Sequence, residues 1–160
     1  MFKVSKILKI SPFLEKKYFL YRNILSNEIV NVNKLDLSGL NLKCIPTEIF
    51  KCRNLKILFL YCNKIKNIPY EINNLNLNSL ILHKNKIKNI CLSNTSDLKI
   101  LDLSNNKFTK FPIDLLYLQL QFLDLSDNHI DYIPKFLNDL TDYRYKNLKL
   151  YIHNNPCTNV

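Results

Sequence analysis

The side chains that could do chemistry in this chain are few and scattered. It has three histidines and five cysteines among 160 residues, and neither His83 nor His153 has a cluster of cysteines or carboxylates around it. A zinc site or a general base would need such neighbours. A lone glycine, Gly39, also excludes a glycine-rich phosphate loop. We therefore predict no catalytic residue, no metal site and no cofactor, and hence a protein that is not an enzyme.

The cysteines indicate a reducing environment. Their number is odd and no two form a close CxxC pair, so we expect unpaired thiols. The N-terminal residues alternate lysine with short apolar pairs and do not build the apolar stretch of a signal peptide. No apolar run approaches the length of a membrane span. These features favour an intracellular, cytoplasmic protein that is not inserted in a membrane.

A repeat organises most of the chain. Similar stretches begin at Val32, Leu55, Leu77, Leu98 and Leu120, so they are separated by 23, 22, 21 and 22 residues. The second reads LKILFLYCNKIKNIPYEINNL and the fourth reads LKILDLSNNKFTKFPIDLLYL. Leucines two residues apart point to the same side of a short strand, and the proline that follows prevents a regular helix there. Because one unit cannot bury its apolar side alone, the units must stack.

These units resemble the leucine-rich repeat proteins, in particular the intracellular type with the pattern LxxLxLxxNxLxxIPxxIxxLxx. The resemblance covers residues 32–155. It implies an α/β solenoid shaped as a horseshoe, with a parallel β-sheet on the concave face and an irregular or 3₁₀-helical convex side. It also implies protein binding, because most members bind proteins and the family has no catalytic residues of its own.

The predicted organisation has three parts. Residues 1–31 form an N-terminal cap with an amphipathic helix at about residues 12–26, which could instead lie on a membrane surface. The third repeat lacks the proline, so we expect an irregular convex side there. Five repeats follow the cap over 32–140, with the boundaries 32–54, 55–76, 77–97, 98–119 and 120–140, then an insertion at 141–147 and, over 148–160, a partial sixth repeat with the C-terminal tail.

Asparagines end five of the predicted strands and share one position in the repeat. An amide both donates and accepts hydrogen bonds, so a stacked column of amides can satisfy the backbone groups of the turns. The first repeat has Leu40 at this position, so we expect a less regular turn there, with Gly39 relieving the backbone. We interpret the column as structural; it consists of Asn63, Asn85, Asn106, Asn128 and Asn155.

The residues between the leucines are expected to face the concave surface. Repeats one, four and five read LDLS, a polar pattern that suits an exposed strand, whereas repeats two and three read LFLY and LILH. An exposed apolar and aromatic patch is typical of an interaction site, although drift on a tolerant surface would give the same pattern. We predict a non-catalytic, monomeric module that binds an unidentified protein on its concave face. The predicted binding residues are Ile57, Phe59, Tyr61, Ile81, His83 and Lys84.

Lysines form a second candidate surface. The net charge is +10, and residues 32–96 contribute ten Lys or Arg against three acids. The ridge has little of the arginine and stacking aromatics that nucleic-acid binding adds, so solubility or an acidic protein partner is the simpler interpretation. Electrostatic binding to nucleic acid or an anionic membrane, through the ridge and the basic N-terminal region, is the alternative function. The predicted ridge consists of Lys43, Lys64, Lys66, Lys86, Lys88 and Lys107.

Overall fold

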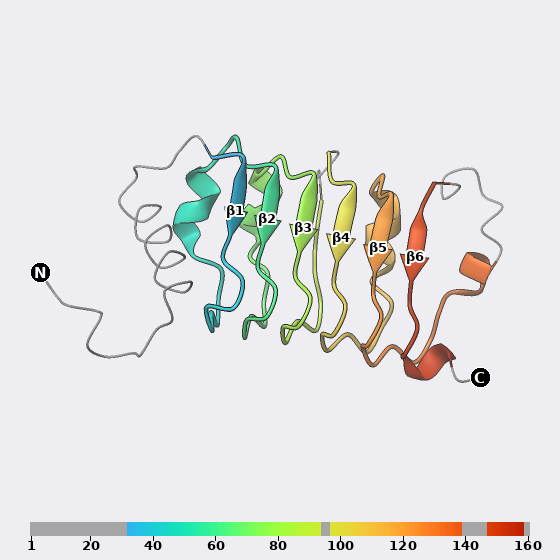
Figure 1. The fold of residues 1–160 in the computed structure, drawn as a ribbon. Helices are drawn as coiled ribbons and strands as arrows, with labels where there is room; N and C mark the ends of the chain where they lie inside the picture. The colour runs from blue at the N-terminus through green and yellow to red at the C-terminus, as the bar shows by residue number, and fades with distance from the viewer. Residues whose placement is uncertain (1–31, 94–96, 139–146, 159–160) are drawn as a thin grey trace, which may run out of the picture.

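The strands of the repeats form one parallel sheet. The computed structural model describes residues 32–93, 97–138 and 147–158. In these residues six three-residue strands pair in sequence order, all parallel (Figure 1). The predicted leucine-rich repeat solenoid is thereby confirmed. The strands are β1 (Lys34–Asp36), β2 (Ile57–Phe59), β3 (Ser79–Ile81), β4 (Ile100–Asp102), β5 (Phe122–Asp124) and β6 (Lys149–Tyr151).

The register of the sheet places one leucine of each repeat directly beside the next. Leu58 pairs with Leu35 on one side and Leu80 on the other, and Leu101, Leu123 and Leu150 continue the row. The first five are buried in the core, while Leu150 at the end of the sheet is only partly buried. Because each leucine lies against two neighbours, the core is a continuous column rather than a separate cluster in each repeat.

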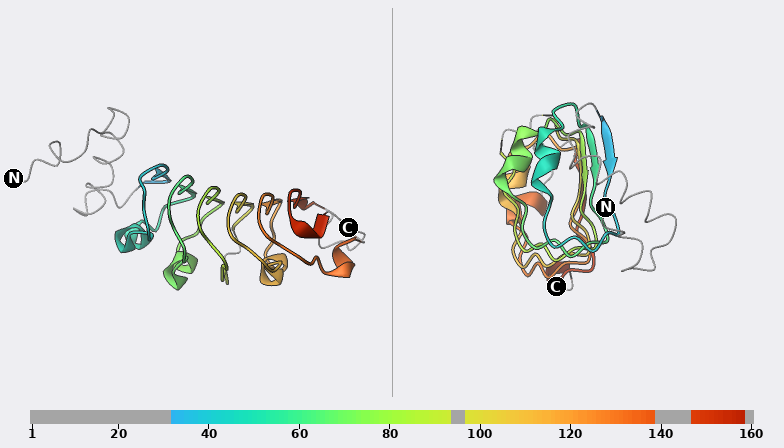
Figure 2. Two further views of the ribbon diagram at one scale, coloured as in Figure 1. Left: turned by 90° about the horizontal axis from the view of Figure 1, so that it is seen from below. Right: turned by 90° about the vertical axis from the view of Figure 1, so that its left-hand side faces the viewer.

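Short 3₁₀ helices lie on the opposite side of the stack from the strands, except the one after the last strand, which lies at the foot of β6 (Figure 1 and Figure 2). Four of them begin directly after a proline, which fixes the backbone at a helix start and lacks the N–H that a longer preceding helix would need. The predicted 3₁₀ convex side is confirmed. The helices are η2 (Thr47–Lys51), η3 (Tyr70–Asn74), η4 (Ile113–Tyr117), η5 (Lys135–Asn138) and, after the last strand, η7 (Pro156–Thr158).

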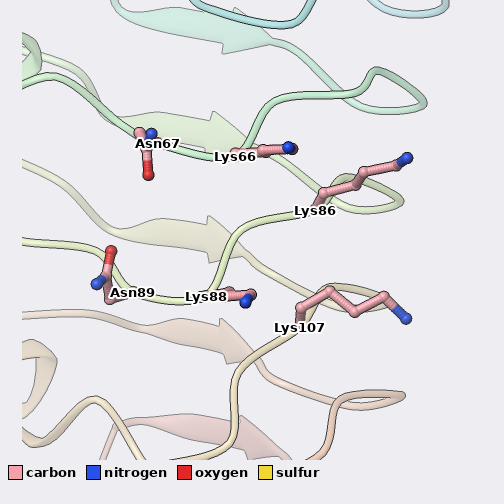
Figure 3. A pocket seen from close by; sticks show the side chains of 6 residues that line it. All are labelled: Lys66, Asn67, Lys86, Lys88, Asn89 and Lys107. Atoms are coloured by element: carbon pink, nitrogen blue, oxygen red, sulfur yellow. The ribbon is translucent and has the colours of Figure 1, made fainter.

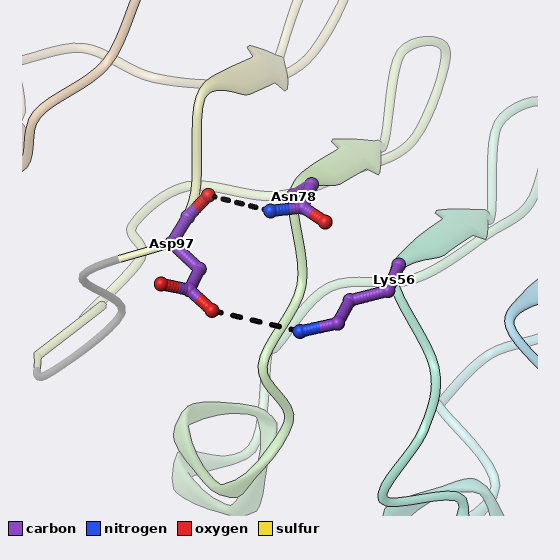
Figure 4. A network of polar contacts seen from close by, with 3 residues as sticks. All are labelled: Lys56, Asn78 and Asp97. Carbon is purple, nitrogen blue, oxygen red and sulfur yellow. Dashed lines mark hydrogen bonds and ion pairs between the residues drawn. The ribbon is translucent and has the colours of Figure 1, made fainter.

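The third repeat differs on this side, as its missing proline predicts. Residues 88–93 contain no helix. The Ser93 N–H donates to Asn73 Oδ1 at 3.0 Å, which attaches this segment to η3. Farther along the chain, Asp97 contacts the start of the second and third repeats: Lys56 Nζ lies 3.5 Å from Asp97 Oδ2, and Asn78 Nδ2 donates to the Asp97 carbonyl at 3.0 Å (Figure 4). The ion pair is about half exposed and contributes less than about 1 kcal/mol.

Two predicted parts of the chain fall outside the described residues. These are the N-terminal cap, with its helix at about 12–26, and residues 141–146 of the insertion. The repeat boundaries stay predictions. In the segments that the structure does describe, no helix is long and apolar enough to cross a membrane.

Candidate functional site

The asparagine column joins neighbouring repeats at the end of each strand. Asn85 Nδ2 donates to the carbonyls of Leu60 and Leu82, both at 2.9 Å, and its Oδ1 accepts from the Ile65 N–H at 3.0 Å. Each amide therefore bonds to its own strand and to the repeat before it. The same three kinds of bond recur at Asn63, Asn106, Asn128 and Asn155.

The first repeat lacks its own asparagine and relies on the amide of the second. Asn63 Oδ1 accepts from both Leu40 N–H at 3.0 Å and Leu42 N–H at 2.9 Å. Gly39 has a φ of +70°, but this conformation is not special to the first turn. The residue at the same position in every later repeat also has a positive φ: Cys62, Lys84, Asn105, Asp127 and Asn154. The irregularity of the first turn is instead a second left-handed residue, Asn41, with a φ of +57°.

Three columns of side chains alternate with the buried leucines along the sheet. Residues two apart on a strand share a face, so the positions on either side of each core leucine point outward together. The column at the start of the strands is Lys34, Ile57, Ser79, Ile100, Phe122 and Lys149. The next is Asp36, Phe59, Ile81, Asp102, Asp124 and Tyr151. By the same alternation, the third is Ser38, Tyr61, His83, Ser104, Ser126 and His153.

The predicted aromatic residues of repeats two and three lie together on this face. The rings of Tyr61 and His83 stack with centroids 4.7 Å apart and an angle of 6° between their planes. Phe59 meets Tyr61 edge-on at 6.2 Å, and Lys34 Nζ lies 5.2 Å from the centre of the Phe59 ring. We call this the aromatic patch: it consists of Ile57, Phe59, Tyr61, Ile81 and His83, all of them partly exposed. Large aromatic side chains held in fixed orientations are suited to bind apolar groups of a partner.

Lys84 is placed differently from the other predicted binding residues. It is exposed and lies in the turn after β3, where its φ is +54° and its N–H donates to the Ser104 carbonyl at 3.0 Å. It therefore lies beside the aromatic patch rather than in one of its columns.

The polar LDLS pattern of repeats four and five does not describe the whole concave face there. Ile100, in β4, is 39% exposed. Phe122 and Tyr151, on β5 and β6, have ring centroids 5.3 Å apart. These three side chains make a second apolar area on the same face. The sequence contains the signal, because Ile100 and Phe122 occupy the position that Ile57 has in repeat two.

The LDLS pattern has a structural role that the sequence analysis missed. Asp102 Oδ1 accepts from the Ser104 N–H at 3.0 Å and from its hydroxyl at 2.7 Å. Asp36 and Asp124 hold their serines in the same way. Ser38 and Ser126 are buried, each only 3% exposed. The aspartate–serine pair thus stabilises the strand end locally, as an Asx turn does.

The lysine ridge lies on the edge where the strands turn. Four of its six lysines line one surface hollow of about 490 Å³, together with Asn67 and Asn89 (Figure 3). These four are Lys66, Lys86, Lys88 and Lys107. The other two, Lys43 and Lys64, are exposed but do not line the hollow.

The cysteines lie apart from one another, and all five are free thiols. Cys52 is buried in the core, and this burial raises the pKa of its thiol above the ordinary value. Across residues 32–93, 97–138 and 147–158, no three His, Cys, Asp or Glu side chains gather in a way that could hold a metal ion.

Comparison with known proteins agrees with this architecture. The family model described as Leucine Rich Repeat matches residues 97–118 and 119–140. The chain is 28% identical over 137 residues to the probable inactive serine/threonine-protein kinase roco10 of Dictyostelium discoideum. The matched region covers 78% of this chain and 5% of roco10. The chain therefore spans a small fraction of this relative.

The solved structures that are similar to the chain include two leucine-rich repeat examples. A leucine-rich repeat protein of Leptospira interrogans has a TM-score of 0.63 and 33% identity, over 72% of this chain and 29% of that one. The second is the ectodomain of the plant membrane receptor kinase GASSHO1/SCHENGEN3 from Arabidopsis thaliana, in complex with CASPARIAN STRIP INTEGRITY FACTOR 2. It has a TM-score of 0.59 and 28% identity, over 82% of this chain and 20% of that one. Both similarities extend across most of the described repeats.

Proposed function

Because this chain is a leucine-rich repeat protein, we propose that it binds a partner protein on the concave face of its sheet, with the aromatic patch at the centre of the contact. The observation that carries the proposal is the stacked pair of Tyr61 and His83, with Phe59 against it, on an open face. Tyrosine and other aromatics are frequent anchors of protein interfaces, because they bury a large area with little loss of side-chain entropy.

The rest of the face is consistent with a contact that crosses several strands. Ile100, Phe122 and Tyr151 extend the apolar surface beyond the aromatic patch, over β4 to β6. Asp102 and Asp124 lie beside them and are partly exposed. A partner that covers both areas would bring apolar groups to the two ends of the contact. The similar receptor ectodomain was solved in complex with CASPARIAN STRIP INTEGRITY FACTOR 2, which supports binding as the use of such a solenoid.

We further propose that the chain is a monomer and that this interaction takes place inside a cell. The five free thiols support it, since secreted proteins tend to oxidise theirs. A single peak of monomer mass in size-exclusion chromatography coupled to light scattering would support the monomer; a dimer peak would contradict it.

Affinity purification with a matched pair of variants tests the concave site. Phe59→Glu with Tyr61→Glu places two charges in the aromatic patch. The control, Tyr70→Glu with Tyr117→Glu, makes the same kind of change on the convex side, where the two rings are 62% and 78% exposed. We expect a partner that the wild type and the control retain and the patch variant loses. If a patch variant with an unchanged circular dichroism spectrum retains the same partner, the site is wrong.

A further inference from the structure

We propose that the hollow on the turn edge is a second binding surface, which takes a short acidic peptide segment of a protein partner. It lies on a different side of repeats two to four from the aromatic patch and does not depend on that patch. Its lining is four lysine side chains and the amides of Asn67 and Asn89 (Figure 3).

Two copies of one sequence motif build the hollow. The stretch Asn-Lys-Ile-Lys-Asn-Ile occurs at residues 63–68 and again at 85–90. The central isoleucines, Ile65 and Ile87, are fully buried. Because alternate residues point in opposite directions, the lysines on either side of each isoleucine are directed to the surface. The core thus determines where the charges lie.

The backbone that carries these lysines is fixed from repeat to repeat. The Lys86 N–H donates to the Ile65 carbonyl at 2.8 Å, and the Lys107 N–H donates to the Ile87 carbonyl at the same distance. Ile65 and Ile87 donate in turn to Asn85 Oδ1 and Asn106 Oδ1, both at 3.0 Å. A partner would therefore meet charges on a rigid frame, which lowers the entropy cost of binding.

The positive charge of the hollow is not neutralised by the described part of the chain. None of the four lining lysines lies within ion-pairing distance of a described carboxylate; the described ion pair, Lys56 with Asp97, is elsewhere. The basic stretch also has a definite end. In repeat five the equivalent positions are His129, which lies 3.3 Å from Lys107 Nζ, and Asp131. Four ammonium groups around one hollow repel each other, and a bound anionic group would relieve that repulsion.

The lining favours a peptide over a nucleic acid. Single-stranded nucleic acid is bound by stacking its bases on aromatic rings, and arginine is common at such sites. The lining contains neither. Asparagine amides can instead donate to and accept from a peptide backbone. Adjacent repeats lie roughly 5 Å apart, so the three repeats of the hollow extend over about 10 Å, which three to four residues of an extended peptide would span.

Fluorescence anisotropy with the full chain tests this assignment. The probes are a fluorescein-labelled peptide with four consecutive glutamates in a Gly/Ser background and a labelled oligothymidylate. Lys66→Glu with Lys88→Glu reverses two of the four charges and brings the formal charge of the hollow lining from +4 to zero. Lys135→Glu with Lys149→Glu makes the same net change at exposed lysines elsewhere. We expect the hollow variant to bind the peptide at least about tenfold more weakly than the control does, with the wild-type affinity decreasing steeply as salt increases.

Two results would overturn the proposal. If both variants weaken peptide binding equally, the attraction comes from the net charge of the protein and not from the hollow. If the oligothymidylate binds more tightly than the peptide and is lost selectively in the hollow variant, the surface is a nucleic-acid site. Lys66→Gln with Lys88→Gln, which removes charge without reversing it, should give a smaller loss of the same kind; its thermal unfolding shows whether the fold is intact.

Discussion

Each asparagine of the column connects two repeats through one side chain. Asn106, for example, donates to the carbonyls of Leu82 and Leu103 and accepts from the Ile87 N–H, all within 3.1 Å. These backbone groups are buried at the strand ends and have no other strand to bond to. The amide is therefore part of the backbone hydrogen-bonding scheme, which no apolar side chain of similar size could replace.

Replacing Asn106 by alanine should destabilise the fold. Asn106→Ala leaves the buried Ile87 N–H without a partner, while the carbonyls of Leu82 and Leu103 each keep one bond, from Asn85 and Asn128. The loss costs about 1–3 kcal/mol of unfolding free energy. Urea denaturation followed by circular dichroism measures it. Asn89→Ala is the control, because Asn89 is exposed on the turn edge and its loss should change stability by less than about 0.5 kcal/mol. Equal stability of the two variants would contradict the role given to the column.

The residue before the column position (an asparagine, or Leu40 in the first repeat) has a positive φ in every described turn of the stack. Among these described residues, only Gly39 is a glycine. A β-carbon built on Gly39 meets no atom within 4 Å, so Gly39→Ala tests backbone strain alone. We expect a loss of about 1–2 kcal/mol in unfolding free energy. Gly39→Asn should lose less, because asparagine tolerates this conformation. Lys84→Gly should instead stabilise the fold, because glycine adopts the positive φ of this position without strain. An Ala variant as stable as the Asn variant would contradict the strain.

At the scale of the elements, the strand and the 3₁₀ turn follow from the repeat because few residues decide them. The spacing of leucines predicts the register from Leu35 to Leu150, and proline predicts where the convex helices begin. The aromatic patch is predictable for the same reason, since period-two alternation decides which residues face outward. The partner that binds the patch cannot be predicted in this way, because packing leaves the outward residues free to vary.

Other features could not be predicted from single positions. Ser38 and Ser126 are buried although serine in an LDLS strand looks exposed, and each bonds to the aspartate two residues earlier. Ser104 makes the same bond to Asp102 and is only partly buried, so the bond alone does not determine the burial. Ile100 and Phe122, by contrast, could be predicted: they come directly before the core leucine, as Ile57 does, so the same alternation places them on the concave face. The comparison of the LDLS stretches missed them because this column lies just outside the four letters.

The position of a strand in the sheet should determine the cost of removing its leucine. Leu101 is fully buried between β3 and β5, whereas Leu150 is partly buried in β6 at the end of the sheet. Leu101→Ala should lower the unfolding free energy by about 2–5 kcal/mol, and Leu150→Ala by clearly less, because less apolar area and a smaller cavity are at stake. Urea titrations of the two variants give the comparison. A larger loss for Leu150→Ala would contradict this dependence on position in the sheet.

At the scale of the molecule, the two candidate surfaces lie in the same repeats but differ in chemistry. The aromatic patch is apolar and belongs to the strands, while the hollow is cationic and belongs to the turns. The charge is also distributed unevenly along the chain. Residues 32–96 include ten basic and three acidic residues, and residues 97–160 include seven basic and eight acidic residues. The solenoid is therefore electrically polar along its length, so an acidic partner would be attracted to the N-terminal half of the stack.

The two ends of the stack should unfold unequally, and two cysteines can report it. Cys52 is buried near β1 and β2, while Cys157 lies half-buried in η7, after the last strand. Cys157 lies in a three-residue 3₁₀ helix without a buried residue, whereas Cys52 is packed in the core with 2% of its surface exposed, and segments with few buried contacts open first. Maleimide labelling across a urea series, read by mass spectrometry, should therefore modify Cys157 at a lower urea concentration than Cys52.

The exposed thiols Cys44, Cys62 and Cys91 provide the native reference, because they should react without urea. Burial raises the pKa of both reporter thiols, so the folded state keeps their protons at a pH where the unfolded thiols ionise. Stability from these groups is present below the ordinary thiol pKa and decreases as pH rises through it, and alkaline pH should lower the urea needed to label both. Labelling of Cys52 and Cys157 at the same urea concentration would instead show that the described repeats unfold as one cooperative unit.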